Sequence, residues 1–310
     1  MTESYHVAGA NANEARAYQS TVGFGLPGAG QARRMRVQHL IGYQTLGEGP
    51  MRDTTRTYLD FAVETAWQAG QLTLGYYQTG VRPDMKADAS PVTEADRQAE
   101  RLIRERISAQ YPDHALVGEE YGEEGTAQSS HRWIIDPIDG TRAFVRGVPM
   151  YAVLIGLEIE GEVVAGVAHF PALNELLAAG KGLGCWWNGR PARCSTVSRL
   201  SDAMVTHADP ASFAQHGRGR AWEQFQALGG FRYGWADAYA YLLVATGRAE
   251  VALDPVMSVW DCAPLLPILN EAGGYFGDWD GNPTIYANEG VATTNALRDE
   301  VLAITRLRDE

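Results

Sequence analysis

The fold and the chemistry of this chain are decided by nine residues, Trp133-Ile134-Ile135-Asp136-Pro137-Ile138-Asp139-Gly140-Thr141. The three apolar residues at the start of this stretch are typical of a buried strand, which is predicted to end at Asp136. A turn at Pro137 would direct the carboxylates of Asp136 and Asp139 into one cleft. Gly140 and Thr141 follow at once, and they favour a tight turn into a helix or loop. Carboxylate oxygens in such an arrangement suit a hard divalent cation such as Mg²⁺.

The composition is that of an ordinary globular protein with an excess of acidic residues. The chain has 310 residues, enough for one large domain or two moderate ones, and 45% of them are hydrophobic. Its formal net charge of −12 argues against nucleic-acid binding, which requires a basic face. An acidic chain that acts on a phosphate needs cations to screen the repulsion between the two.

The location of the protein is predicted from its cysteines and its apolar runs. The three cysteines form no even framework and no CxxC motif, so a reducing cytoplasm is favoured over secretion. No uninterrupted apolar run approaches the ~20 residues that span a bilayer. We therefore expect a cytoplasmic protein whose partners include neither membranes nor nucleic acids.

The sequence divides into three regions. Residues 1–50 contain eight glycines and no helical periodicity, and they are interpreted as a disordered extension. Met51 is a candidate for the native start, because amphipathic patterning begins just after it. Residues 51–195 are expected to form an N-terminal α+β half with the metal site, and residues 196–310 a C-terminal α/β half with the substrate pocket.

Apolar periodicity predicts the elements of both halves. Helices are expected over residues 54–78 and 93–110, with Thr93 as a suitable N-cap for the second. The strands predicted in the first half cover residues 115–117, 133–135, 151–159, 163–170, 174–179 and 184–187. In the second half, predicted strands (203–206, 231–233, 251–254) alternate with predicted helices (213–228, 238–246, 262–272, 297–308), which is typical of an α/β layer.

Acidic residues follow three of the apolar runs. They are Glu119 in Gly-Glu-Glu, the pair Asp136 and Asp139, and Asp261 in Trp-Asp-Cys. Acids at the ends of buried strands or at the start of a helix are placed to converge on a cleft. Taken singly, each has a simpler interpretation: a solvated loop at Glu119, a helix N-cap at Asp261, and a calcium loop at the aspartate pair, although the EF-hand pattern is missing.

Together these motifs resemble the inositol monophosphatase family of Mg²⁺-dependent phosphatases. The resemblance covers about residues 54–308, and the motifs have the family's order and spacing. They are Gly118-Glu119-Glu120, Asp136-Pro137-Ile138-Asp139-Gly140-Thr141, and Trp260-Asp261 followed by Glu271-Ala272-Gly273-Gly274. The resemblance implies a layered α+β fold of the α/β class, the family's α-β-α-β-α sandwich, and a homodimer.

The same resemblance implies the metal ligands. They would be Glu119, Asp136, the backbone carbonyl of Ile138, Asp139 and Asp261. Asp136 would bridge two Mg²⁺ ions, with Asp139 and Asp261 on one ion and Glu119 and the Ile138 carbonyl on the other. A third, weaker ion would use Glu119.

The resemblance also assigns groups to catalysis and to phosphate binding. Thr141 would position the attacking water and help to deprotonate it, with its hydroxyl held by Asp96, and Glu119 is a catalytic residue as well as a ligand. Gly140 and Thr141 are expected beside the substrate. Lys86 stands where the family often has a basic residue near the metals, and the alternative for it is a loop lysine in water.

Two segments point to the substrate. After Thr141 the chain continues Arg-Ala-Phe instead of the Thr-Asn-Phe of inositol monophosphatases, which is similar to the branch that hydrolyses histidinol phosphate. Residues 232–241 resemble the Gly-Asp-x-x-Gly-Tyr segment of that branch, with Asp237 as the acid. A carboxylate there suits a substrate that carries an ammonium group. Asp254 is the other acid expected to contact the substrate. Arg232 is also assigned to the substrate site, as an anchor that acts through its charge or through a structural ion pair.

The chain also departs from the histidinol branch. Trp235 and Ala236 stand where that branch has a smaller residue and a glycine, and Ala240 replaces another glycine, so the pocket would be narrower or its preference shifted. The interpretation is a histidinol-phosphatase, with an inositol-, sugar- or nucleotide-phosphate phosphatase as the alternative. A non-catalytic binding protein of the same fold is the third hypothesis, but such a protein would be expected to have lost ligands.

Overall fold

A computed structural model describes residues 50–310, except for residues 88, 127–128, 229, 236 and 310. The extension predicted over residues 1–50 lies outside the described residues apart from Pro50, and the native start at Met51 stays a prediction. All described residues belong to one compact unit. No helix in this part of the chain combines the length and the apolar character that a membrane span requires.

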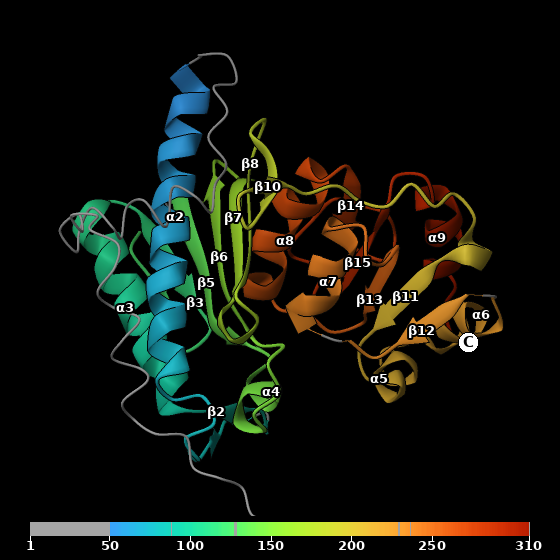
Figure 1. The fold of residues 1–310 in the computed structure, drawn as a ribbon, viewed down its shortest axis with the longest axis horizontal. Helices are drawn as coiled ribbons and strands as arrows, with labels where there is room; N and C mark the ends of the chain where they lie inside the picture. The colour runs from blue at the N-terminus through green and yellow to red at the C-terminus, as the bar shows by residue number, and fades with distance from the viewer. Residues whose placement is uncertain (1–49, 88, 127–128, 229, 236, 310) are drawn as a thin grey trace, which may run out of the picture. The chain divides into compact units, whose positions relative to one another are not determined.

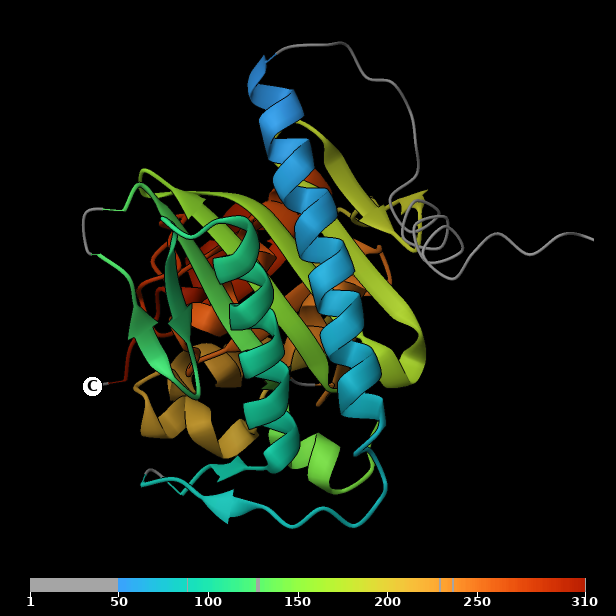
Figure 2. The same ribbon diagram turned by 90° about the vertical axis from the view of Figure 1, so that its left-hand side faces the viewer.

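The first sheet contains Asp136 and Asp139 in one of its inner strands. Its eight strands have the order β10-β9-β8-β7-β6-β5-β3-β4, and only β3 and β5 pair in parallel. The strands are β3 (Ala115–Gly118), β4 (Gly122–Glu124), β5 (His131–Asp139), β6 (Ala152–Ile159), β7 (Glu162–Phe170), β8 (Glu175–Gly180), β9 (Gly184–Trp187) and β10 (Arg190–Pro191). Two helices, α2 (Pro50–Leu74) and α3 (Glu94–Gln110), cover one face (Figure 2).

The second sheet has the order β12-β11-β13-β15-β14. Its first three strands are parallel, and the other two pair antiparallel. The strands are β11 (Met204–His207), β12 (Phe231–Tyr233), β13 (Val251–Asp254), β14 (Gly274–Gly277) and β15 (Gly290–Thr294). The carboxyl ends of the three parallel strands therefore lie at one edge of this sheet, which is where ligands bind in α/β sheets.

Two helices fill the space between the sheets, and three more cover the outer face of the second sheet. The inner helices are α7 (Asp237–Ala245) and α8 (Val259–Glu271), and the outer ones are α5 (Pro210–Gln215), α6 (Gly219–Ala227) and α9 (Arg298–Thr305). The layers are thus helix, sheet, helix, sheet, helix, as Figure 1 shows. The α-β-α-β-α sandwich expected from the sequence is confirmed.

The first sheet is buried on both faces, which explains its continuous apolar runs. Trp133 and Ile135 pack under α2 and α3, whereas Ile134 between them packs under α7 and α8. This alternation follows from the two-residue period of a strand. Shorter elements complete the chain: β1 (Asp84–Met85), β2 (Pro91–Val92), α4 (Thr141–Val145), η2 (Pro171–Leu173) and η3 (Leu200–Asp202).

Several predicted boundaries are wrong for local reasons. β5 does not end before Asp136, because it continues through a register shift against β6 to Asp139. The helix predicted over residues 213–228 is interrupted between α5 and α6, where Gly217 has a φ of +69°. The helix predicted to start at Cys262 begins at Val259, so that Ser258 is the N-cap and Asp261 lies in the first turn. The prediction missed β1, β2, β4, β10, β14 and β15.

α8 packs against the first sheet at two glycines. Gly156 in β6 and Gly166 in β7 lie opposite each other in the strand pairing. A Cβ on Gly156 would lie 2.8 Å from the Cβ of Ala263, and a Cβ on Gly166 would lie 2.2 Å from the carbonyl oxygen of Pro264. The helix that carries Asp261 therefore lies directly on the strands, and the glycines set its distance from β5.

We expect Gly166→Ala to lower the free energy of unfolding by about 1–3 kcal/mol, because the added methyl group forces α8 away from the sheet. Urea unfolding followed by circular dichroism measures the change. Gly234→Ala is the control, since a Cβ there would meet no atom closer than 3.5 Å. Equal stabilities of the two variants would contradict the close approach of α8.

Candidate active site

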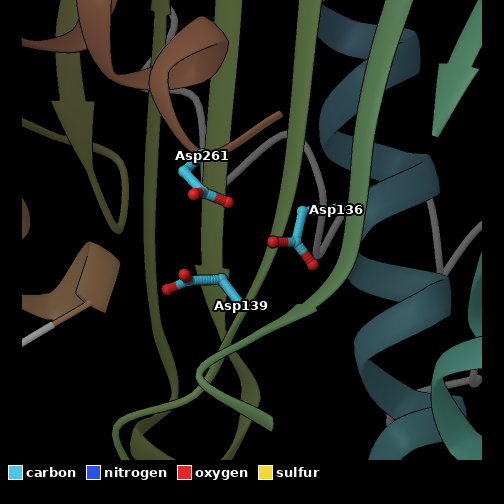
Figure 3. Close-up of side chains that lie close together, drawn as sticks. All are labelled: Asp136, Asp139 and Asp261. Carbon is cyan, nitrogen blue, oxygen red and sulfur yellow. The ribbon is translucent and has the colours of Figure 1, made fainter. Parts of the chain in front are cut away.

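Three aspartates from two elements converge at the centre of the molecule. Asp136 and Asp139 come from β5, and Asp261 comes from the first turn of α8 (Figure 3). Each offers one carboxylate oxygen, and these three atoms all lie within 4.8 Å of one another. Asp136 lies deeper, with 2% of its surface exposed, against 9% for Asp139. The register shift in β5 allows both of its aspartates to face Asp261.

Each aspartate is held by one backbone N–H. The N–H of Ile138 donates to Oδ1 of Asp136 (2.9 Å), and the N–H of Ser258 donates to Oδ2 of Asp261 (2.7 Å). The N–H of Ala238, in the first turn of α7, donates to Oδ2 of Asp139 (2.7 Å). These bonds fix the carboxylates and leave further oxygen lone pairs directed at the space between them.

Ionising all three carboxyl groups of the cluster is energetically unfavourable without a counter-charge. Burial raises the pKa of Asp136 well above its ordinary value, and the charges of Glu119 and Asp261 raise it further. Burial also raises the pKa of Asp139, followed by the charge of Asp237. For Asp261, burial raises the pKa to about 7 although the hydrogen bond from Ser258 opposes it. A group of buried oxygens that resist ionisation beside one another fits a divalent cation, which compensates their charge.

Thr141 connects the aspartates to α3. Its hydroxyl lies 3.1 Å from Oδ1 of Asp96 and 3.0 Å from the carbonyl oxygen of Ile138, and both are acceptors. Asp96 is itself held at Oδ2 by the N–H (2.8 Å) and the hydroxyl (2.6 Å) of Thr93, the N-cap of α3. Burial raises the pKa of Asp96, although these hydrogen bonds oppose the shift. The contact between Thr141 and Asp96 that the resemblance implied is present; their part in catalysis stays a prediction.

Glu119 is outside the group of three aspartates, but its charge acts on all of them, and its side chain contacts a lysine. Nζ of Lys86 lies 2.8 Å from Oε1 of Glu119 and 2.7 Å from Oε1 of Glu120. Burial alone would lower the pKa of Lys86, but its hydrogen bonds to these two carboxylates raise it above its ordinary value. Lys86 is therefore not a loop lysine in water. Its role beside the substrate, and that of Glu119 as a ligand and catalytic residue, stay predictions.

Sequence reasoning gave no role to Glu120. Burial raises its pKa to about 7, while Lys86 lowers it and Glu119 raises it again. The sequence motif singled out Glu119 alone, and it is the contact with Lys86 from the β1–β2 hairpin that adds Glu120 to the same group.

A second acidic group lies next to the cluster, at the edge of the second sheet. Asp237 begins α7 with a left-handed φ of +56°, and a Cβ on Gly140 would lie 2.9 Å from its Oδ2. Burial raises the pKa of Asp237, and the nearby charge of Arg142 lowers it. Asp254 ends β13, and burial raises its pKa to about 8, with a further contribution from Asp237. The charge of Asp237 therefore acts on Asp254.

Arg232 contacts the end of α6. Its Nη1 donates to the carbonyl oxygens of Phe225 (3.4 Å) and Leu228 (2.9 Å), at the end of α6. Cationic side chains commonly hold the last carbonyls of a helix in this way. Contact of Arg232 with a substrate stays a prediction, as does that of Gly140.

Stability should depend on pH and Mg²⁺ together. The raised carboxyl pKa values stabilise the metal-free fold fully below about pH 4, where unfolded Asp titrates. This stability is lost as the pH rises through the folded values, about 7 for Asp261 and about 8 for Asp254. We expect the thermal midpoint in EDTA to be lower at pH 8 than at pH 5. Saturating Mg²⁺ should raise the midpoint more at pH 8 than at pH 5.

Scanning calorimetry at both pH values, with EDTA or Mg²⁺, measures these shifts. Asp139→Asn removes one charge from the cluster. In EDTA, its thermal midpoint should therefore decrease less between pH 5 and pH 8 than that of the unsubstituted protein. The same Mg²⁺-induced shift at pH 5 and at pH 8 would contradict binding at ionised carboxylates.

Comparison with known proteins agrees with this geometry. Residues 54–309 match the model of the inositol monophosphatase family. A histidinol-phosphatase of Chlorobaculum parvum is 45% identical over 247 residues, or 79% of this chain and 95% of that protein. An inositol-1-monophosphatase of Mesorhizobium japonicum is 32% identical over 249 residues, or 79% and 94% of the two chains.

Among solved structures, the extragenic suppressor protein suhB of Bartonella henselae matches with a TM-score of 0.74 and 30% identity. The match covers 81% of this chain and 98% of that one. A family model that spans most of the chain, relatives that match over nearly their whole length and a shared fold lead to one conclusion: this chain belongs to the inositol monophosphatase family of phosphatases.

Proposed function

We propose that this protein is a Mg²⁺-dependent histidinol-phosphatase, which hydrolyses histidinol phosphate to histidinol and phosphate. The observation that carries the proposal is the position of Asp237, a largely buried carboxylate directly beside Gly140 and the aspartate cluster. The 45% identity to the C. parvum histidinol-phosphatase supports it. By the family resemblance we also propose a homodimer, and the free cysteines among the described residues support a cytoplasmic location.

The phosphate end of the substrate belongs at the three aspartates. A phosphate monoester is a dianion, which these carboxylates repel. Two Mg²⁺ ions, when bound, supply the positive charge that screens this repulsion and lower the pKa of a coordinated water. The residues that would hold them are Glu119, Asp136, the Ile138 carbonyl, Asp139 and Asp261. A third ion at Glu119 would be weaker.

Thr141 and Asp96 act on the attacking water. The single proton of the Thr141 hydroxyl is donated to Asp96 or to the Ile138 carbonyl, so the hydroxyl oxygen accepts a hydrogen bond from the water. The proton of the water passes to Thr141 as the hydroxyl proton passes to Asp96. Burial raises the pKa of Asp96, which makes it a better proton acceptor than an exposed aspartate.

The other end of histidinol phosphate carries an ammonium group and an imidazole ring. Asp237 is placed to pair with the ammonium group, and the charge of Arg142 helps to keep its carboxylate ionised. Asp254 is a second acceptor on the same side and suits the N–H of the ring. A hydroxyl group can donate to Asp254 equally well, so inositol phosphate is the alternative substrate, and the M. japonicum relative supports it.

The assignment of the metal ligands predicts the effect of Asp139→Asn. We expect phosphate release to fall on the order of 10²-fold or more, because a cation loses one carboxylate, while the fold is kept. A malachite-green assay measures the rate, and circular dichroism measures the fold. Asp113→Asn, on the exposed loop after α3, should retain full activity. Near-native turnover by Asp139→Asn would show the ligand assignment to be wrong.

The assignment of Asp237 predicts a selective effect of Asp237→Asn. Asparagine also adopts a left-handed φ, so the backbone at this position can be kept. We expect kcat/KM to fall about 10- to 100-fold for histidinol phosphate, since a hydrogen bond to a charged group is worth about 1.5–3 kcal/mol. For inositol 1-phosphate, which has no amine, the change should be about threefold at most.

The same assay on the unsubstituted protein tests the function itself. A strong preference for inositol phosphate would overturn the histidinol assignment. If Mg²⁺ supported turnover of neither ester nor of 3′-phosphoadenosine 5′-phosphate, a non-catalytic binding protein of this fold would be the better interpretation.

A further inference from the structure

Glu100 is a fully buried carboxylate in α3 that has no part in the chemistry above. We propose that Glu100 is a positioning residue for the metal site: it fixes the turn after β3, which carries Glu119. The proposal rests on the assignment of Glu119 as a metal ligand in the proposed function. Three sets of contacts carry it, on the turn, at Gly118 and at Arg104.

The backbone of the turn is held from both sides. The N–H of Glu119 donates to the carbonyl oxygen of Ile135 in β5 (3.2 Å), which continues the pairing of the parallel strands. The next two N–H groups turn away from the sheet and donate to Glu100, that of Glu120 to Oε2 (2.7 Å) and that of Tyr121 to Oε1 (3.2 Å). Glu100 thus accepts the two N–H groups that immediately follow Glu119.

There is no room for a side chain between the Glu100 carboxylate and the backbone at Gly118. A Cβ on Gly118 would lie 2.0 Å from Oε1 of Glu100 and 2.9 Å from Nη2 of Arg104. Gly118 is not in a left-handed conformation, so backbone freedom does not account for a glycine here. The glycine of the Gly-Glu-Glu motif is explained by the approach of the Glu100 carboxylate.

Arg104 compensates the buried charge and extends the connection. Its Nε donates to Oε1 of Glu100 (2.7 Å), one helical turn away. Its other nitrogens donate to the carbonyl oxygen of Gly122 and to the carboxylate of Glu124 (3.1 Å), both in β4. A buried carboxylate requires such a partner, since an unpaired charge in the interior is strongly destabilising.

The turn directs two carboxylates into the site. Glu119 and Glu120 both reach Lys86, and the charge of Glu119 acts on Asp136. A displacement of the turn would therefore move Glu119 relative to Asp136 and leave Asp139 and Asp261 in place, because other elements hold those two. The loss of Glu100 should weaken the ion that depends on Glu119 and spare the ion at the three aspartates.

The test is calorimetric titration of Mg²⁺ into the full-length protein after treatment with EDTA. Glu119→Gln identifies the binding event that depends on this ligand. In Glu100→Gln, we expect that event to weaken about 10- to 100-fold, the usual effect of losing a group that holds a ligand. The affinity of the other event should change by no more than about threefold. Glu105→Gln, an exposed glutamate on the same helix, is the matched control and should leave both unchanged.

A purely structural role of Glu100 gives a different result. Glu100→Gln would then lower the thermal midpoint and leave both binding events unchanged, which would overturn the proposal. If Glu100→Gln does not accumulate, Glu100→Gln/Arg104→Gln removes both charges without leaving Arg104 unpaired in the interior, and the same two outcomes apply.

Failure of the proposed function is recognised separately. If Glu119→Gln binds Mg²⁺ as the unsubstituted protein does, the ligand assignment is wrong, and amide hydrogen exchange decides on the positioning of the turn. Faster exchange at Glu120 and Tyr121 in Glu100→Gln than in Glu105→Gln would support the positioning role. Unchanged exchange at these two amides would overturn it.

Discussion

The structure depends on bringing carboxylates together in the interior. Water stabilises each such charge separately, and a protein interior does so only through hydrogen bonds and counter-charges. The N–H groups that hold the three aspartates belong to Ile138, Ala238 and Ser258, which lie in or beside three different elements. The cluster therefore forms only when β5, α7 and α8 are assembled, and it is a property of the whole fold rather than of one motif.

The helix layer between the two sheets makes this assembly possible. α7 and α8 share one apolar core with both sheets, and α8 lies on the strands of the first sheet at Gly156 and Gly166. Asp261 thus comes from the second half of the sequence, whereas Asp136 and Asp139 come from the first half. The second half of the sequence also supplies two acidic groups near the cluster, Asp237 at the start of α7 and Asp254 at the end of β13.

Features that depend on neighbouring residues could be predicted from the sequence, and features that depend on distant ones could not. Thr93 and Asp96 form the expected start of α3, because a capping box is local. The continuation of β5 to Asp139 depends on pairing with β6, and the interruption at Gly217 on a single backbone angle. The strand Gly274–Gly277 was not predicted, because only its pairing with β15 makes it a strand. The contacts of Glu100 with the turn span about twenty residues, and no local pattern announces them.

Asp96 has two roles whose combination has a consequence for motion. Its Oδ2 closes the capping box of α3, and its Oδ1 accepts from the Thr141 hydroxyl. Helix ends open locally more often than helix centres, with a free energy below that of global unfolding. When the first turn of α3 opens, the Thr141 hydroxyl loses Asp96 and keeps the Ile138 carbonyl as its acceptor. With Thr141 and Asp96 in the roles proposed above, this local opening would limit the fraction of molecules that are competent at any instant, and warming would reduce activity below the temperature at which the protein unfolds.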